Sequence, residues 1–522
     1  MAANTLYYFA AGGTGALSVE PLLHLCAAGV GPDRLAVILI DADVGSPALG
    51  RAQELIGLYD EVRRAFGRPA QGFFRTELIR TSRAESVWSP LGVGDAARLG
   101  SVALQDFVQQ PRMAGPTEDA RVLFDLLFSR EQQIEQLREG FRGNPAIGSI
   151  LMHGLKETPF FKELMNSAKN DTSARFFATG SVFGGTGASG LPVLANVLRG
   201  IGIDSARIGA ALVTPYYSLG EPSREEQQSN RLKPDSAKFM RATAAALPTY
   251  TRGHTDYGAL YVIGDDQSLP KPRKTFSSGG PEQLNDPHFV ELYAAMAALD
   301  FVERGAQHGG APRYVTAGDA EPTWSDLPVG RVAQEELATF LVASNFFLHY
   351  FGSTRSPADE QRLTGELQKL PWIDDADLKP DFVRTHSEQL NLLGRYFDAV
   401  WGYLWATGEN YRALRLADFS SRGRCEVPVP HTYASSKSQP RVPLPMVEKC
   451  LWGRAARRQK SWFRKGAADA LTSPAEMFNW YNEVNKLDVQ GMPGLLRYLR
   501  EGSKRFIGDW FSAATEARGV TV

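Results

Sequence analysis

The chain has 522 residues, of which 43% are hydrophobic and 22% are charged, and its formal net charge is −1. This composition predicts a globular protein large enough for two or more domains, and the balanced charge gives the molecule as a whole no attraction for nucleic acid or an anionic membrane. Its three cysteines, Cys26, Cys425 and Cys450, are too few and too scattered for a disulfide framework or a cysteine metal site.

The start of the chain predicts a strand, a turn, a helix and a second strand. "TLYYFAA" (5–11) is a short apolar run, "GGTG" (12–15) a turn, and "RLAVILIDAD" (34–43) an apolar strand that ends in acids. Such a unit opens a parallel sheet that is covered by helices on both faces. Residues 46–140 contain helical stretches and a middle broken by glycine and proline, and we expect them to form an insertion between sheet strands.

The alternation of strand and helix resumes after this segment. Strands are expected at 173–180, 207–217 and 258–266, and a long apolar helix at 288–305 is expected to be buried and central. Beyond about residue 310 the pattern becomes helical and rich in aromatic residues. We therefore expect an α/β nucleotide-binding domain over 1–305 and a mostly helical α+β C-terminal region over 306–522.

Glycine-rich loops stand between strand and helix at two places, "AAGGTGALS" near the start and "GSVFGGTGASG" at 180–190. Such a loop allows close approach of the backbone and offers N–H groups at the positive end of a helix dipole, which suits phosphate. The first loop also fits half of a dinucleotide fingerprint, with Asp41 or Asp43 as the ribose acid, but Ser18 replaces the third glycine. Neither loop has the lysine of a P-loop.

The second loop is the more specific of the two. It packs glycine into four of the seven positions of "GGTGASG", where an ordinary turn needs one or two, and each glycine has an entropic cost on folding. Two such loops at the same edge of one sheet would hold a polyphosphate from two sides.

The pair of "GGTG" loops resembles the tubulin/FtsZ superfamily of GTPases, with Phe183 where the second loop of that family begins with glycine. Further segments resemble the family in the same order along roughly residues 5–350. These are "FRGNPAIGS" (141–149) as the third nucleotide loop, "LVTPYYSLGEPS" (212–223) as the fifth, "LNDPHFVELYAAMAALDF" (284–301) as the central helix and "EPTWSDLPVG" (321–330) as the seventh loop.

The resemblance implies GTP or GDP with Mg²⁺ as the bound group. The first loop would wrap the α- and β-phosphates and the second the β- and γ-phosphates, through Gly12, Gly13, Thr14, Gly15, Gly184, Gly185, Thr186, Gly187 and Ser189. Further contacts would come from Asp41 and Asp43, with Asp43 at the metal, from Gly143, Asn144 and Pro145 near the γ-phosphate, from Glu221 at the ribose and from Asn285 at the base.

Several of these residues also have a purely structural interpretation. The first loop is also consistent with a plain turn, Asp41 and Asp43 with caps, and "GNP" with ordinary turn chemistry. Asn285 or Asp286 is equally suited to cap the central helix, since Pro287 fits its first turn. His288 is expected to be a core or base-facing residue and not a metal ligand.

In the superfamily, an acid in the seventh loop of one subunit orients the attacking water on the nucleotide of the next subunit. Asp326 in "WSDLP" is the candidate here, and it is also consistent with an ordinary loop residue. Positioning and charge stabilisation provide most of the catalysis of phosphoryl transfer, so one carboxylate is enough for this role.

A basic tract at 449–466, "KCLWGRAARRQKSWFRKG", contains seven basic residues and no acidic one. It is consistent with a solvated helix face or with a contact to a protein, a membrane surface or nucleic acid.

The sequence thus predicts a GTP-binding protein that assembles head to tail with itself into filaments and hydrolyses GTP when the next subunit completes the site. The alternatives are a scaffold of the same fold that does not polymerise and a Rossmann-type enzyme that binds NAD(P). With no signal peptide and no long apolar stretch visible, a cytoplasmic location is expected.

Overall fold

The structure of the chain is a computed structural model. It describes residues 4–79, 87–90, 103–108, 118–134, 141, 144–217, 236–251, 255, 257–265, 287–304, 313–314, 322–351, 365, 371–378, 382–411, 414, 416, 425–428, 441–444, 481, 484 and 487–516.

An eight-stranded sheet forms the centre of the molecule, with strand order β3-β2-β1-β5-β6-β7-β8 and β4 also paired with β2. Every strand pair in it is parallel. The strands are β1 (Thr5–Ala11), β2 (Arg34–Ile40), β3 (Glu77–Leu78), β4 (Val87–Trp88), β5 (Arg175–Ser181), β6 (Ile208–Val213), β7 (Ala259–Ile263) and β8 (Arg313–Tyr314). The α/β class and the parallel sheet predicted from the sequence are confirmed.

The sheet is buried on both faces, which explains why its strands read as continuous apolar runs. Successive side chains of a strand point to opposite faces. In β1, Leu6 and Tyr8 therefore join one hydrophobic core and Tyr7 and Phe9 join the other. A register shift of one residue would exchange the two sets, so packing on both faces fixes the pairing.

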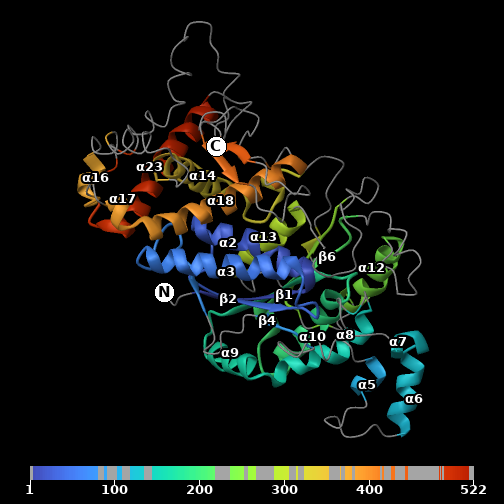
Figure 1. Cartoon of the computed structure of the whole chain (residues 1–522). Coiled ribbons are helices and arrows are strands. Elements are labelled where there is room, and N and C mark those ends of the chain that lie inside the picture. Colours follow the sequence, from blue (N-terminus) through green and yellow to red (C-terminus); the bar gives the residue numbers. More distant parts are fainter. Residues whose placement is uncertain are drawn as a thin grey trace.

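Helices cover both faces of the sheet, and a further helical layer lies outside one of them (Figure 1). One face carries α2 (Val19–Ala28), α3 (Pro47–Ala65) and α13 (Phe289–Arg304), and the other carries α8 (Pro145–Met152), α9 (Pro159–Lys169) and α10 (Thr186–Gly200). The outer layer, beyond α2, α3 and α13, consists of α14 (Gly330–Phe351), α18 (Ser387–Asn410) and α23 (Gly491–Glu516).

The remaining described elements are short or lie at the margins. They are α1 (Gly12–Leu17), α5 (Leu104–Val108), α6 (Glu118–Leu127), α7 (Arg130–Ile134), η2 (His153–Glu157), η3 (Ser205–Arg207), α12 (Ser236–Thr251), η5 (Trp324–Asp326), α16 (Pro371–Asp375), α17 (Phe382–Thr385) and the antiparallel pair β9 (Cys425–Pro428) and β10 (Arg441–Leu444). The segment expected as an insertion includes α3, β3 and β4, which belong to the α/β fold itself.

The C-terminal helices share a hydrophobic core with the sheet. One cluster of buried side chains runs from β1 through α2 and α13 to α14, α18 and α23. Across this layer, the hydroxyl of Tyr396 on α18 donates to the carbonyl oxygen of Leu23 on α2 at 3.0 Å. The core is therefore continuous across residue 305, where the sequence suggested a boundary. In the part of the chain that the structure describes, none of the helices has both the length and the apolar character to cross a membrane.

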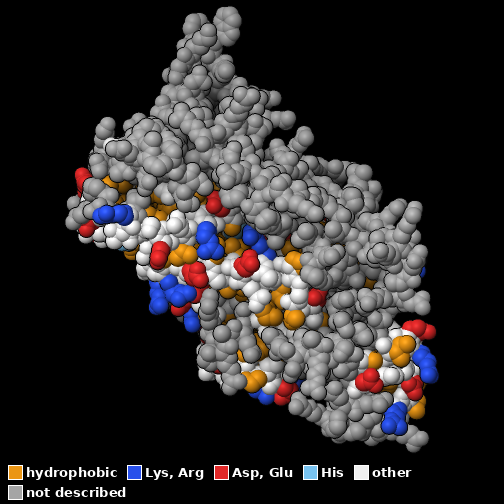
Figure 2. Space-filling model, viewed as in Figure 1, with side chains coloured by type: hydrophobic (Ala, Val, Ile, Leu, Met, Phe, Trp, Pro, Cys, Tyr) orange, Lys and Arg blue, Asp and Glu red, His pale blue; other side chains and the backbone are white. Residues whose placement is uncertain are grey.

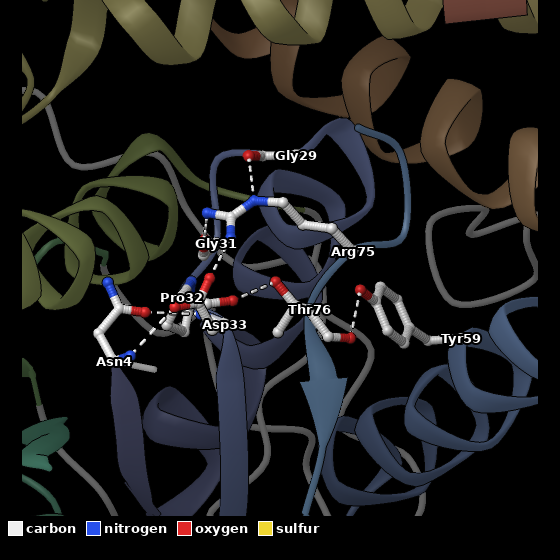
Figure 3. A network of polar contacts seen from close by, with 8 residues as sticks. All are labelled: Asn4, Gly29, Gly31, Pro32, Asp33, Tyr59, Arg75 and Thr76. Carbon is white, nitrogen blue, oxygen red and sulfur yellow. Dashed lines mark hydrogen bonds and ion pairs between the residues drawn. The ribbon is translucent and has the colours of Figure 1, made fainter. Parts of the chain in front are cut away.

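A network of hydrogen bonds fastens the amino-terminal edge of the sheet (Figure 3). Arg75 donates to the carbonyl oxygen of Gly29 at 3.0 Å, to that of Gly31, and to Asp33 Oδ1 at 2.7 Å. Asn4, just before β1, is bound in turn to Asp33, since each residue donates its backbone N–H to the side chain of the other. The network joins the starts of β1 and β2 to the segment that leads into β3.

The surface over α6 and α7 is unusually apolar. Figure 2 shows hydrophobic side chains among charged ones at the end of the molecule where these helices lie. The exposed apolar residues there are Val122, Leu123, Leu126, Leu127 and Ile134. Phe128, just after the end of α6, is by contrast buried.

Candidate functional site

The two glycine loops meet at the point where the strand order reverses. Strand β1 pairs with β2 on one side and with β5 on the other, and Ala11 at the end of β1 lies opposite Gly180 near the end of β5. In open α/β sheets, ligands bind in the crevice at the carboxyl ends of the strands at this switch point. The first loop follows β1, where the sequence predicted a turn and the structure has the short helix α1, and the second follows β5, so both border that crevice.

The loops are in direct contact. Gly12 has a φ of +74°, a left-handed conformation that favours glycine. A Cβ at this position would lie 3.2 Å from the backbone nitrogen of Gly187 and 3.3 Å from Cβ of Thr186. The first loop therefore closes onto the start of α10, and a larger residue at position 12 would push the two loops apart.

Some of the glycines are explained by packing alone. A Cβ on Gly15 would lie 2.6 Å from the carbonyl oxygen of Thr179, and a Cβ on Gly187 would lie 2.6 Å from that of Ser181. These helix starts press against the strand backbone, which excludes any side chain. Partly exposed positions of the two loops are Gly13, Thr14 and Gly184.

Asp41 lies at the end of β2, and its side chain joins the loops from within. The residue is 3% exposed, and its Oδ1 accepts hydrogen bonds from Thr186 Oγ1 at 3.0 Å and from the backbone N–H of Asp43 at 3.1 Å. Burial raises the pKa of the Asp41 carboxyl to about 7, and the hydrogen bond from Asp43 opposes that rise. The carboxyl is directed at protein groups.

Asp43 is the more accessible of the two acids. It is partly exposed, and its Oδ1 accepts from the backbone N–H of Gly45 at 3.2 Å. Magnesium prefers oxygen ligands and is usually held by one or two carboxylates together with substrate phosphates. Within the described ranges there is no group of three or more histidine, cysteine or acidic side chains suited to a metal. An ion shared with phosphate would find the accessible carboxylate of Asp43 at this edge of the sheet, and the hydroxyl of Thr186 as a second oxygen.

Ser189 lies below the surface of the site. It is fully buried, and its hydroxyl donates to carbonyl oxygens of its own helix, those of Gly185 at 2.8 Å and Thr186 at 3.0 Å. A Cβ on Gly148 of α8 would lie 2.3 Å from the Ser189 hydroxyl, so the two helices cross closely here. The structure thus places Ser189 in the helix crossing, away from the partly exposed loop positions.

Asn144 and Pro145 stand at the start of α8, whose first helical residue is Pro145. Proline suits this position because its missing N–H would have no partner there. The side-chain oxygen of Asn144 accepts from Nε2 of Gln132 at 3.3 Å. Pro145 therefore has a structural role at the helix start, whereas the side chain of Asn144 contacts Gln132 and does not cap the helix. Gly148, one turn further along α8, packs against Ser189 of α10.

Phe183 anchors the second loop. Its ring is buried and packs against Phe239 of α12 at 4.7 Å and Tyr217 at 5.9 Å between centroids. Where the tubulin/FtsZ pattern has glycine, this chain thus has a hydrophobic contact that ties the loop to α12 and to the segment after β6.

Sequence reasoning missed a polar cluster at the start of α13. His288 Nδ1 accepts from the backbone N–H of Val290 at 3.2 Å, so its hydrogen is on Nε2, which lies 3.2 Å from Asp265 Oδ2. The hydroxyl of Tyr411, after α18, donates to the same oxygen at 3.0 Å and contacts His288 Nε2. Glu291 accepts from the backbone N–H of His288 at 3.1 Å, so the start of the helix is capped.

Asp326 forms a capping box at η5. Its Oδ2 accepts from the backbone N–H of Thr323 at 2.7 Å and from the Thr323 hydroxyl at 2.6 Å. These hydrogen bonds lower the pKa of the exposed Asp326 carboxyl. The acid therefore stays ionised at neutral pH and is accessible to solvent.

Asp326 precedes α14 by a few residues, and the start of α14 lies at the amino-terminal edge of the sheet. Glu336 in its second turn accepts from Arg500 at 3.3 Å. Arg500 in turn lies against Gly72, because a Cβ there would be 2.7 Å from its Cδ. Gly72 contacts Gly29, which ends α2 just before β2 begins.

The later turns of α14 pack on α18. Ser344 accepts from Trp401 Nε1 at 2.9 Å, and Phe347 packs against Phe397 at 5.3 Å between ring centroids. Helix α18 is followed by Tyr411, which contacts Asp265 just beyond the carboxyl end of β7. The second turn of α14 therefore lies beside the amino-terminal edge of the sheet, and Asp326 precedes Glu336 of that turn by ten residues in the chain.

The other predicted site residues, Gly143, Glu221 and Asn285, and the basic tract 449–466 lie outside the described residues. A scan against models of known protein families gives no match, and a search of curated proteins finds no significant relative of this chain.

Proposed function

We propose that the chain is a GTP-binding protein of the tubulin/FtsZ type that assembles head to tail. The observation that carries the proposal is the position of two glycine-rich loops on either side of the switch point. GTP, with Mg²⁺, would be bound by the loops, and Asp326 would act on the nucleotide of the next subunit.

The second loop has the electrostatics that phosphate requires. Helix α10 has 15 residues and no acidic side chain in its first turn. Its first N–H groups have no partner within the helix and point toward the crevice. The helix dipole adds partial positive charge at this end. Gly13, Thr14 and Gly184 are partly exposed beside it, so the backbone there is accessible to a polyphosphate.

The helix that follows Asp326 favours catalysis between subunits, because its second turn lies beside the amino-terminal edge of the sheet. Strand β1 has seven residues, which corresponds to a length of roughly 23 Å from edge to edge. An acid at the amino-terminal edge would not cover that distance within one molecule. A contact that joins one end of a subunit to the opposite end of the next is heterologous, and its repetition produces a filament unless the rotation closes a ring.

The strand order alone does not favour this proposal over a Rossmann-type enzyme, because dinucleotide-binding folds share it. The second glycine loop does, because it has no role in a dinucleotide fingerprint. Asp41 is buried and bound to Thr186, which leaves Asp43 as the ribose acid of the Rossmann alternative. Competition between GTP and NAD(P) for the purified protein distinguishes the two.

The test is GTP turnover per molecule over a wide range of protein concentration, with pelleting and electron microscopy of the same samples. The proposal predicts turnover that rises above a threshold concentration together with filaments, and its loss in Asp326→Ala. Thr323→Ala is the matched control, because it removes the capping partner and keeps the acid. Loss of turnover in both variants would instead point to the shape of the loop, and failure of the wild type to bind GTP would refute the proposal.

A second candidate is a scaffold of the same fold that binds nucleotide and does not polymerise. The capping box favours it, because Asp326 already has a structural role at η5. It predicts GTP binding without turnover at any concentration, and no pelleting.

A further inference from the structure

Two separate segments of the chain meet at one carboxylate oxygen, and a third lies beside them. Asp41 Oδ1 accepts from Thr186 Oγ1 at 3.0 Å and from the backbone N–H of Asp43 at 3.1 Å. Thr186 is the first residue of α10, and its Cβ is also in contact range of Gly12. The oxygen therefore links the segment after β2 to the start of α10, where that helix touches the first glycine loop.

The direction of the hydrogen bond between Asp41 and Thr186 decides whether the Thr186 hydroxyl can still donate to a bound group or only accept from it. A hydroxyl has one hydrogen to donate and two lone pairs that accept. A carboxylate oxygen that already receives a backbone N–H acts as an acceptor toward Thr186, so the threonine is the donor. With its hydrogen committed to Asp41, the hydroxyl offers only lone pairs to a bound group. Phosphate oxygens need donors, whereas a cation needs lone pairs.

On the basis of the proposed function, we propose that Asp41 is a positioning residue that directs the hydroxyl oxygen of Thr186 toward the nucleotide-bound Mg²⁺ and not toward the phosphates. The same Asp41 oxygen holds the backbone of Asp43, whose carboxylate is the other hard oxygen ligand available here. Asp41 would thus fix the positions of Thr186 and Asp43 relative to each other without itself contacting the cation. The phosphates would be held by the backbone N–H groups of the loops.

The burial of the pair supports a positioning role. Asp41 and Thr186 are each 3% exposed, so the hydrogen bond between them is shielded from competing water. The Asp41 backbone N–H is also fixed, because it donates to the carbonyl oxygen of Trp88 at 3.2 Å. Groups of this kind, which hydrogen-bond the ligands of a metal, usually change metal affinity by about 10- to 100-fold when removed.

The first experiment replaces the hydroxyl oxygen of Thr186 with sulfur. Binding of a fluorescent GTP analogue is measured at equilibrium for Thr186→Cys with either Mg²⁺ or the softer Cd²⁺ present. We expect the variant to lose at least about tenfold of the affinity that Mg²⁺ supports and to regain it with Cd²⁺, because a thiolate prefers a soft ion. Thr14→Cys on the first loop is the matched control, and Cd²⁺ should give it no such advantage.

The second experiment removes the positioning group. Asp41→Ala should weaken the dependence of nucleotide affinity on Mg²⁺ by about tenfold, whereas Asp41→Asn, which keeps an accepting oxygen, should retain most of that dependence. Circular dichroism shows whether each variant is folded. If Asp41→Ala does not fold, the Mg²⁺ and Cd²⁺ measurements on Thr186→Cys test the inference.

The inference is overturned if the wild type binds GTP with Mg²⁺ but Cd²⁺ does not restore Thr186→Cys, or if folded Asp41→Ala keeps its full Mg²⁺ dependence. If the wild type does not bind GTP under any of these conditions, the proposed function fails and the inference fails with it.

Discussion

The hydroxyl of Tyr411, just beyond α18, donates a hydrogen bond to Asp265, just beyond β7, at 3.0 Å. This contact brings the C-terminal helices to the carboxyl edge of the sheet, beside His288 at the start of α13. Burial raises the pKa of the Tyr411 phenol, so this group remains a donor throughout the ordinary pH range. The helical layer is thereby joined to the edge at which we propose that the nucleotide binds.

Removal of this donor should destabilise the protein. Tyr411→Phe leaves the acceptor Asp265 and its neighbour His288 without one of their partners, which we expect to lower the free energy of unfolding by about 1–2 kcal/mol. Urea unfolding followed by circular dichroism measures it. Tyr250→Phe is the control, because this buried hydroxyl has no hydrogen-bond partner in the described structure, and its loss should change stability by less than about 0.5 kcal/mol. Equal effects of the two variants would contradict the role of Tyr411.

Glycines in this chain differ in what they do, and the structure separates them. A Cβ on Gly15 would lie 2.6 Å from one backbone atom and 2.7 Å from another, whereas a Cβ on Gly57 of α3 would meet nothing within 4 Å. Gly15→Ala should therefore force strand and helix apart and cost about 1–3 kcal/mol or more. Gly57→Ala should stabilise α3 by about 0.5–1 kcal/mol. Thermal unfolding of the two variants gives shifts of opposite sign if this is correct. A Gly15→Ala protein as stable as the wild type would refute the close packing.

The sequence predicted the five longer strands of the sheet and the central helix because both depend on local apolar patterns, but it did not predict the two-residue strands β3, β4 and β8. Adjacent loops at one edge also followed, since the strands are parallel. The cluster of Asp265, His288 and Tyr411 did not follow, because its members are up to 146 residues apart and none belongs to a motif. The packing role of Gly15 was hidden for a related reason. Glycine is needed both where a strand backbone packs closely and where a phosphate binds, and the sequence alone does not distinguish the two cases.

Arg75 at the amino-terminal edge provides a test of geometry rather than charge (Figure 3). Its guanidinium donates to two carbonyl oxygens and to Asp33, and a lysine has a single point of donation in place of this planar fork. Arg75→Lys should therefore lower the free energy of unfolding by about 1–3 kcal/mol, because carbonyl oxygens lose their donors. Arg64→Lys, in an exposed ion pair with Asp60, should change it by less than about 0.5 kcal/mol. Chemical denaturation of both variants checks the difference, and equal stabilities would show that charge alone matters at position 75.

Glu20 on α2 gives a prediction for acid pH. Burial raises the pKa of its carboxyl, but the attraction of Arg51, whose Nη2 lies 2.7 Å away, and the hydrogen bond with His24 outweigh this and bring the pKa down from 4.5 to about 2. A folded-state pKa below the unfolded one contributes stability that is complete above about pH 4.5 and is lost as the pH falls toward 2. The difference corresponds to roughly 3 kcal/mol.

Glu20→Gln should therefore be less stable than the wild type at neutral pH, and the gap should narrow as the pH falls from 5 to 3, because the unfolded wild type then takes up a proton at Glu20 that the folded carboxylate, with its pKa of about 2, does not bind. Urea unfolding at a series of pH values measures the gap. Glu54→Gln, exposed on α3 near Arg51 in the sequence, is the control and should differ little from the wild type throughout. A gap that stays constant down to pH 3 would mean that the ion pair with Arg51 does not contribute to folding, and that Glu20 is held by the packing of α2 against α3 alone.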